Sequence, residues 1–205
     1  QENRFQPEIG SLAAQIATSS DMLARAEGEI LVMKTNQDAV ASRLAGLEDA
    51  LPRDPAEAPD GGIWWAGQWG NLVGRIDPMS GEMREYPLPP GSMPHSVTLD
   101  RDGGVWFTGN KNGTLGRLDP ASGDIEVVDM PDPSVRDPHT AVFDDDGVLW
   151  FTAQHANRVG RLDPQTGEVE LVAMPTTGSR PYGIKIDAEG TPWVACNGSN
   201  CLVRV

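Results

Sequence analysis

The sequence predicts an all-β protein of the β-propeller class, built from four-stranded blades and preceded by a helical or coiled-coil segment. The first observation is a repeated aromatic run, whose tryptophans are Trp64, Trp106, Trp150 and Trp193. A strand-rich repeat with a period of about 43 residues is typical of propeller blades. The second observation is that Asp, Gly and Pro separate the short apolar or alternating runs within each copy, as expected for successive hairpins.

Four copies of this unit account for most of the chain, although only the middle two are complete. We expect a helical or coiled-coil segment over residues 1–51, a proline-rich linker over 52–60, and blades over 61–93, 94–137, 138–180 and 181–205. Polar residues stand where the first blade needs its first strand, so that strand is either absent or degraded. Because the array is open at both ends, we expect an oligomer or a part of a larger chain.

The segment before the repeats has a helical pattern. From Leu12 to Leu51 apolar residues recur in steps of three and four, which predicts an a/d heptad seam. Two stretches, 18–21 and 35–38, match the capping box that begins a helix, and they argue against one continuous helix. Two interpretations stay open: an oligomerising coiled coil, or two or three short helices packed against the β part.

Each blade contains features with a structural explanation. An Asp-Pro-x-Ser/Thr-Gly turn follows the third strand, in which Pro presets φ and Gly accepts a positive φ. One arginine recurs at the same position of each third strand, as Arg75, Arg117, Arg161 and Arg204, and it follows a glycine in the first three copies. This recurrence favours a contact between blades over an anion site. The acidic run 144–146 falls on a turn that other copies share, which favours a solvated hairpin turn over a calcium site.

Composition limits the partners. The net charge of −14 disfavours nucleic acid and anionic membrane surfaces, because both would repel the protein. No apolar run approaches the roughly 20 residues that span a bilayer. The two cysteines, Cys196 and Cys201, fall on the two arms of one hairpin, where either a disulfide or free thiols would fit. We expect a secreted or periplasmic protein, with a cytoplasmic location left open.

Departures from the repeat indicate a candidate site. The residue after the blade-opening proline is His95 in the second blade, His139 in the third and Tyr182 in the fourth. Since the first strand of each blade lines the central channel, these side chains should be neighbours at one channel end. Asp137 directly precedes the second Pro-His pair. Histidine side chains and a carboxylate that converge in this way are what a general base and a metal site require. Alternatively, the two histidines could simply cap the starts of their strands by hydrogen bonding.

Further candidates follow the aromatic strands. Gln154 and His155 come after the third blade's aromatic strand, and Trp69 stands at the corresponding place in the first blade. We expect a small-molecule or peptide ligand at the channel mouth, with Tyr182, His155 and Trp69 as its binding residues.

The runs PHSVTLDRDGGVWFT, NGTLGRLDP, DPHTAVFDDDGVLWFT, NRVGRLDP and RPYGIKID resemble those of the streptogramin B lyases, also called virginiamycin B lyases. The resemblance extends from about Gly61 to the C-terminus. It implies a closed propeller of six or seven blades. It also implies a magnesium-dependent elimination that linearises a cyclic depsipeptide.

Carried over by motif, the resemblance assigns catalytic roles to His95, His139 and Gln154, and a metal-binding role to Asp137. Two of these positions depart from the family pattern. Asp137 is shorter than the family's Glu by a methylene, and the neutral Gln154 stands where a Glu belongs, so magnesium would be held more weakly. Two functions stay open: a divergent lyase acting on a cyclic depsipeptide or ester, or a non-catalytic propeller that binds a ligand or protein.

Overall fold

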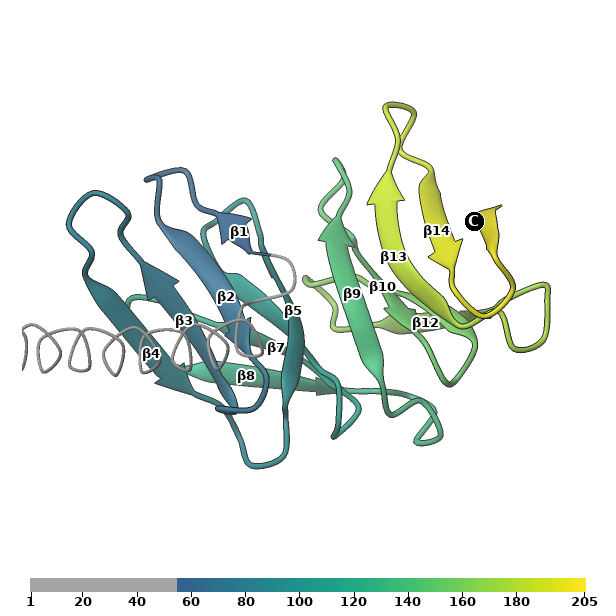
Figure 1. Cartoon of the computed structure of the whole chain (residues 1–205), viewed down its shortest axis with the longest axis horizontal. Coiled ribbons are helices and arrows are strands. Elements are labelled where there is room, and N and C mark those ends of the chain that lie inside the picture. Colours follow the sequence, from purple (N-terminus) through teal and green to yellow (C-terminus); the bar gives the residue numbers. More distant parts are fainter. Residues whose placement is uncertain (1–54) are drawn as a thin grey trace, which may run out of the picture. The chain divides into compact units, whose positions relative to one another are not determined.

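The computed structural model describes residues 55–205, which form strands and turns without a helix, so this range contains no helix that could cross a membrane. They fold into four antiparallel sheets that follow one another in chain order (Figure 1). The first three sheets have four strands and the fourth has three. This arrangement confirms the all-β class and the predicted blades. The predicted helical or coiled-coil segment lies outside the described residues.

The strands follow the sequence closely. The first sheet contains β1 (Ala56–Glu57), β2 (Ile63–Gly67), β3 (Leu72–Ile76) and β4 (Met83–Pro87). The second contains β5 (Pro94–Leu99), β6 (Val105–Gly109), β7 (Thr114–Leu118) and β8 (Ile125–Asp129). The third contains β9 (Pro138–Phe143), β10 (Leu149–Ala153), β11 (Arg158–Leu162) and β12 (Val169–Ala173). The fourth contains β13 (Pro181–Ile186), β14 (Pro192–Cys196) and β15 (Cys201–Arg204).

The first strand of the first sheet is short rather than absent. β1 has two residues, and Ala56 pairs with Trp64 while Glu57 pairs with Ile63. This strand lies within the range that the sequence assigns to a linker. Proline lacks a backbone N–H, so Pro55 and Pro59 restrict how far the ladder can extend on either side.

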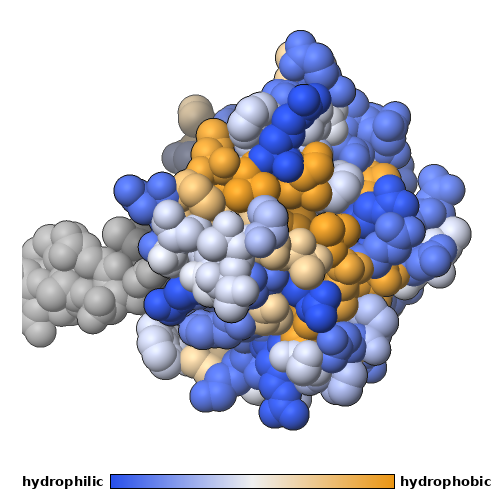
Figure 2. All heavy atoms as spheres, turned by 90° about the vertical axis from the view of Figure 1, so that its right-hand side faces the viewer, coloured by the Kyte–Doolittle hydropathy of each residue, from blue (hydrophilic) through white to orange (hydrophobic). Residues whose placement is uncertain are grey.

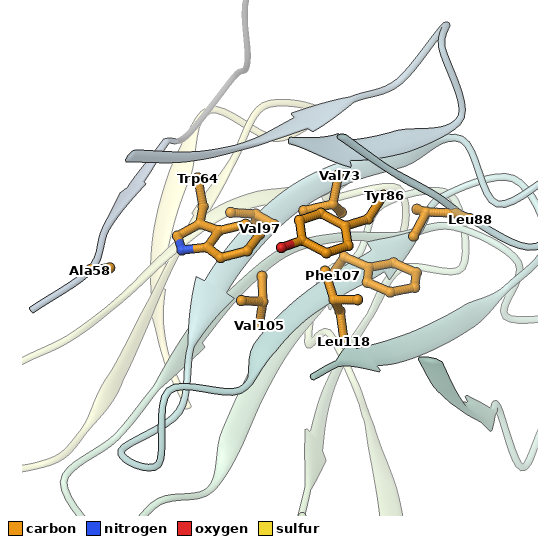
Figure 3. Packing of buried hydrophobic residues seen from close by; sticks show 9 residues of the cluster. All are labelled: Ala58, Trp64, Val73, Tyr86, Leu88, Val97, Val105, Phe107 and Leu118. Atoms are coloured by element: carbon orange, nitrogen blue, oxygen red, sulfur yellow. The ribbon is translucent and has the colours of Figure 1, made fainter. Parts of the chain in front are cut away.

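Side chains from neighbouring sheets form the core between the blades (Figure 3). Its recurring element is an aromatic ring that lies over a glycine of the next strand in its own sheet. Phe107 is paired with Gly116, and Phe151 with Gly160. A Cβ atom at Gly160 would lie 2.1 Å from Cζ of Phe151, so no larger residue fits beside the ring. The fourth sheet pairs Val194 with Val203 instead, which divides the same space between two medium-sized side chains.

A second recurring element joins the first hairpin of three sheets. The indole N–H of Trp106 donates to Asp100, that of Trp150 to Asp144 and that of Trp193 to Asp187, at 3.0, 2.8 and 2.7 Å. Asp144 also accepts turn amides, which confirms the acidic run as a hairpin turn. The aspartate six residues before each tryptophan is therefore a structural residue.

The arginines of the third strands correct one expectation. Arg75 bonds to Asp60, Arg117 to Asp100, Arg161 to Glu170 and Arg204 to Thr191. Every partner belongs to the same sheet as its arginine, so these bonds lie within blades and not between them.

Asp100 gives a testable stability prediction. Burial acts to raise the pKa of Asp100, but hydrogen bonds from Trp106, Arg117 and the Gly104 amide outweigh it and lower the pKa. A lowered pKa in the folded state stabilises the protein above the pKa of the unfolded chain, and this contribution is lost as pH falls through the folded value. We expect Asp100→Asn to lower the free energy of unfolding at pH 7 by about 1–3 kcal/mol. The loss should shrink towards pH 3, as measured by urea unfolding across that range; an equal loss at both pH values would contradict it.

Candidate functional site

Three aromatic side chains gather where the inner strands begin. The rings of His95 and His139 lie 3.5 Å apart between centroids, and the ring of Tyr182 lies 4.1 Å from that of His139. Both histidines are buried. Each of the three follows a blade-opening proline at the start of β5, β9 or β13, and β9 contacts both of the other strands. The predicted proximity of the three side chains is confirmed.

Bulges and hydroxyl groups set this geometry. The register of each inner strand shifts near its start, between Pro94 and Val97 in β5 and between Pro181 and Gly183 in β13. A bulge re-aims a side chain relative to the regular pleat. Threonines of the neighbouring sheets then hold the backbone: Thr108 donates to the carbonyl of His139 at 2.9 Å, and Thr152 to that of Tyr182 at 2.7 Å.

The side chain of His139 has a further polar neighbour. Its Nδ1 lies 3.2 Å from the hydroxyl oxygen of Thr140, the next residue of β9. Beyond the ring cluster, the same three inner strands line a hollow of about 370 Å³, with Val97, Thr140 and Ile184 among its walls. The residues that directly follow the three rings in β5, β9 and β13, Ser96, Thr140 and Gly183, therefore line this hollow.

Asp137 and His155 form a pair of their own. The carboxylate of Asp137 accepts a hydrogen bond from the backbone N–H of His155, and its Oδ2 lies 2.8 Å from Nδ1 of the same residue. The side chain of Asp137 is 14% exposed and that of His155 is 68% exposed. A carboxylate on Nδ1 favours the tautomer that carries its proton there, which leaves Nε2 as an acceptor.

This pair replaces a backbone contact that other blades make. At the corresponding turn, the N–H of Lys111 donates to the carbonyl of Ser92, and that of Gly198 to the carbonyl of Ser179. In those two blades the residue before the proline has a positive φ, 43° at Met93 and 52° at Arg180. Asp137, at the same repeat position, is not among the positive-φ residues. In the third blade the carboxylate thus does what a carbonyl does elsewhere.

Two more predicted residues, Gln154 and Trp69, lie in the turns that follow the aromatic strands. Gln154 is buried in the β10–β11 turn, where its backbone carbonyl accepts the N–H of Asn157. Trp69 lies in the β2–β3 turn of the first sheet and is 75% exposed. It occupies the repeat position of Lys111 and His155. The roles assigned to these two residues stay predictions.

The described residues contain no preformed cluster of acidic, histidine or cysteine ligands for magnesium. Within residues 55–205 no three His, Cys, Asp or Glu side chains are grouped so that they could hold a metal ion. The one carboxylate assigned to the metal, Asp137, is bonded to His155, and the imidazole rings of His95 and His139 lie against each other with their planes tilted by 36°. Magnesium prefers several hard oxygen ligands, and these side chains do not supply them. We therefore derive no reaction step through a metal.

The sheets and the site together define a β-propeller protein with a histidine-containing site on its inner strands. The sequence model described as the Virginiamycin B lyase family matches residues 23–205. This match covers most of the chain, so the chain belongs to the virginiamycin B lyase family.

Solved structures agree with this assignment. A catalytically inactive histidine-to-alanine variant of virginiamycin B lyase from Staphylococcus aureus, with quinupristin, is 36% identical, with a TM-score of 0.70 over 76% of this chain and 52% of the other. A streptogramin B lyase structure is 30% identical, with a TM-score of 0.68 over 76% of this chain and 54% of the other. A putative gluconolactonase, 17% identical with a TM-score of 0.61 over 74% of this chain and 57% of the other, shares the fold alone.

Two further results concern how much of each relative this chain covers and whether a curated protein matches it. The chain spans about half the length of the lyase structures that it matches. No functionally curated protein matches the chain.

Proposed function

We propose that this chain forms part of a closed propeller of six or seven blades that opens a cyclic depsipeptide or ester by elimination. The observation that carries the proposal is the close contact between the rings of His95 and His139 beside Tyr182. Membership of the virginiamycin B lyase family supports the reaction class. The similar S. aureus enzyme, inactive as a histidine-to-alanine variant, supports a histidine at its centre.

In the proposed reaction, His139 is the base that accepts a proton from the substrate. In the elimination, a base removes the proton on the carbon next to a carbonyl, a double bond forms, and the C–O bond at the adjacent carbon breaks. The ester oxygen leaves with the bonding electrons as a carboxylate, so no water is consumed. A neutral imidazole suits the first step near neutral pH.

Tyr182 and His155 supply binding groups in this scheme. The ring of Tyr182 contacts His139 and contributes an aromatic surface for a cyclic peptide. His155, held through Nδ1 by Asp137, presents its other ring nitrogen as a hydrogen-bonding group. Both are therefore proposed as substrate-binding residues, and Asp137 as the group that orients His155.

The reaction class is tested by product analysis. The full chain of residues 1–205 is incubated with a streptogramin B-type depsipeptide in water labelled with heavy oxygen. We expect a linear product with a dehydro-residue and the same mass as the substrate, because elimination adds no water. A product that gains labelled water would show hydrolysis and overturn the proposal.

Magnesium dependence is a separate prediction. Since Gln154 is neutral and Asp137 is bonded to His155, we expect weak magnesium binding by the wild-type chain in calorimetric titration. Gln154→Glu adds an anionic oxygen ligand and should tighten binding, on the order of tenfold. Absence of binding by both proteins would contradict the metal prediction and leave the role of His139 unaffected.

A non-catalytic binding propeller is the second candidate. The observation that favours it is that Asp137, which stands at the family's acid position, is bonded through its carboxylate to the ring of His155. This function predicts that the depsipeptide binds and is recovered intact after long incubation with excess magnesium. A linear product under the same conditions would exclude it.

A further inference from the structure

The fourth sheet carries a pair of thiols at one rung of its ladder. Cys196 ends β14 and Cys201 begins β15, and the two residues pair directly across the hairpin. Both are free thiols in the structure. They form the last rung before the turn of residues 197–200, so only a short loop separates them.

Backbone register places these thiols within bonding range. Residues directly opposite in an antiparallel pair have Cα atoms about 4.5–5.5 Å apart. Disulfides usually join Cα atoms about 4.4–6.8 Å apart, so both values fall inside the permitted range. Opposed residues also project to the same face of a sheet. Accordingly, Cys196 and Cys201 pack in one cluster with Val159 and Met174 of the third sheet.

The two thiols differ in their surroundings. Cys196 is 4% exposed, and its burial, followed by the neighbouring Cys201 thiol, raises the pKa of Cys196 to about 11. Cys201 is half-buried, and its sulfur lies 3.0 Å from the hydroxyl of Ser199. Because the thiolate is the reactive form, the more accessible Cys201 should react first and Cys196 second.

The blade architecture does not require thiols at this rung. The corresponding rung holds Gly67 and Leu72 in the first sheet, Gly109 and Thr114 in the second, and Ala153 and Arg158 in the third. Those hairpins form equally well without cysteine. The pair is thus a feature of the fourth sheet alone among the four that the structure describes.

The hairpin also adjoins the site residue Tyr182. Cys196 pairs on its other side with Pro181, the residue before Tyr182. Tyr182, Cys196 and Cys201 line one shallow hollow at this end of the fourth sheet. Figure 2 views the side on which the fourth sheet lies and shows apolar and polar surface side by side. A change at the thiol pair therefore alters one wall of a hollow that Tyr182 shares.

We propose that Cys196 and Cys201 form a thiol–disulfide exchange site that reacts with a low-molecular-weight disulfide. The Cys201 thiolate attacks one sulfur of the small disulfide, which releases one small thiol and forms a mixed disulfide. Cys196 then attacks the Cys201 sulfur and releases the second small thiol. The two protein thiols lose two protons and two electrons, and the small disulfide is reduced to two thiols, so the exchange is balanced.

The test uses the full chain and glutathione disulfide, followed by intact-protein mass spectrometry. We expect the wild-type chain to lose two hydrogen atoms and to keep no glutathione. Cys196→Ser should accumulate a glutathione adduct on Cys201, because the second thiol is missing, and Cys201→Ser should react far more slowly. The oxidised wild-type chain should show a Tm higher by roughly 4–8 °C than the reduced chain.

A matched control tests whether the position of two cysteines on this rung is sufficient for a disulfide to form, whichever blade carries them. In a Cys196→Ala, Cys201→Ala background, Ala153→Cys with Arg158→Cys places two thiols at the same rung of the third sheet. This variant should also form an internal disulfide. A wild-type chain that retains two free thiols, or keeps a stable glutathione adduct, while the control oxidises would overturn the proposal. Far-UV circular dichroism of the serine variants verifies that they remain folded.

Discussion

Replacing Phe151 by alanine is expected to lower the free energy of unfolding by about 3–5 kcal/mol. The side chain is fully buried between the second and third sheets, and its ring lies over Gly160 of β11. Removal of the ring leaves a cavity that the glycine cannot fill. Urea unfolding followed by tryptophan fluorescence measures the change. The exposed Val172 serves as a control, since Val172→Ala should change stability by no more than about 0.5 kcal/mol.

The fourth sheet supplies a compensating variant for the same position. Gly160→Val alone should be strongly destabilising, because its Cβ would meet the ring of Phe151 at 2.1 Å. Phe151→Val combined with Gly160→Val reproduces the Val194–Val203 pair of the fourth sheet. The double variant should therefore be more stable than the sum of the single changes predicts. Simple additivity would show that the two positions do not share one packing volume.

The sequence predicted the blades because their determinants are local. Turn residues with special φ values, such as Gly81 and Gly123 at 74° and 82°, recur at fixed distances from the marker tryptophans. The two-residue strand β1 was predicted only as absent or degraded, because a pair of ladder contacts leaves no apolar alternation. The arginine bonds were assigned between blades although they lie within them. A repeated charge shows that a contact exists and does not identify its partner.

The candidate site was predictable only in part. The repeat position after the blade-opening proline was enough to bring His95, His139 and Tyr182 together, since the inner strands of adjacent blades start side by side. The bond between Asp137 and His155 was not predicted. It depends on the backbone conformation before Pro138, which differs from that of the other blades, and no residue pattern reports that difference directly.

His139→Ala is expected to lower kcat for ring opening by about 10²–10⁴-fold, which is the usual contribution of a general base. His95→Ala should act mainly on KM, because we propose that His95 contributes to binding beside His139 and does not take the proton. Steady-state kinetics with a streptogramin B-type depsipeptide separate the two effects. Lys111→Ala serves as the control, since Lys111 stands in the turn of the neighbouring blade where the third blade has His155, outside the histidine pair.

Chemical rescue distinguishes a missing base from a disturbed fold. Alanine at position 139 leaves a space between the rings of His95 and Tyr182, and free imidazole can enter it and accept the proton in place of the side chain. We expect added imidazole to restore part of the activity of His139→Ala and none of that lost in His95→Ala. Equal rescue of both variants would assign the proton transfer to the pair as a unit. Activity of His139→Ala close to the wild-type value would remove His139 as the base, even if elimination itself were observed.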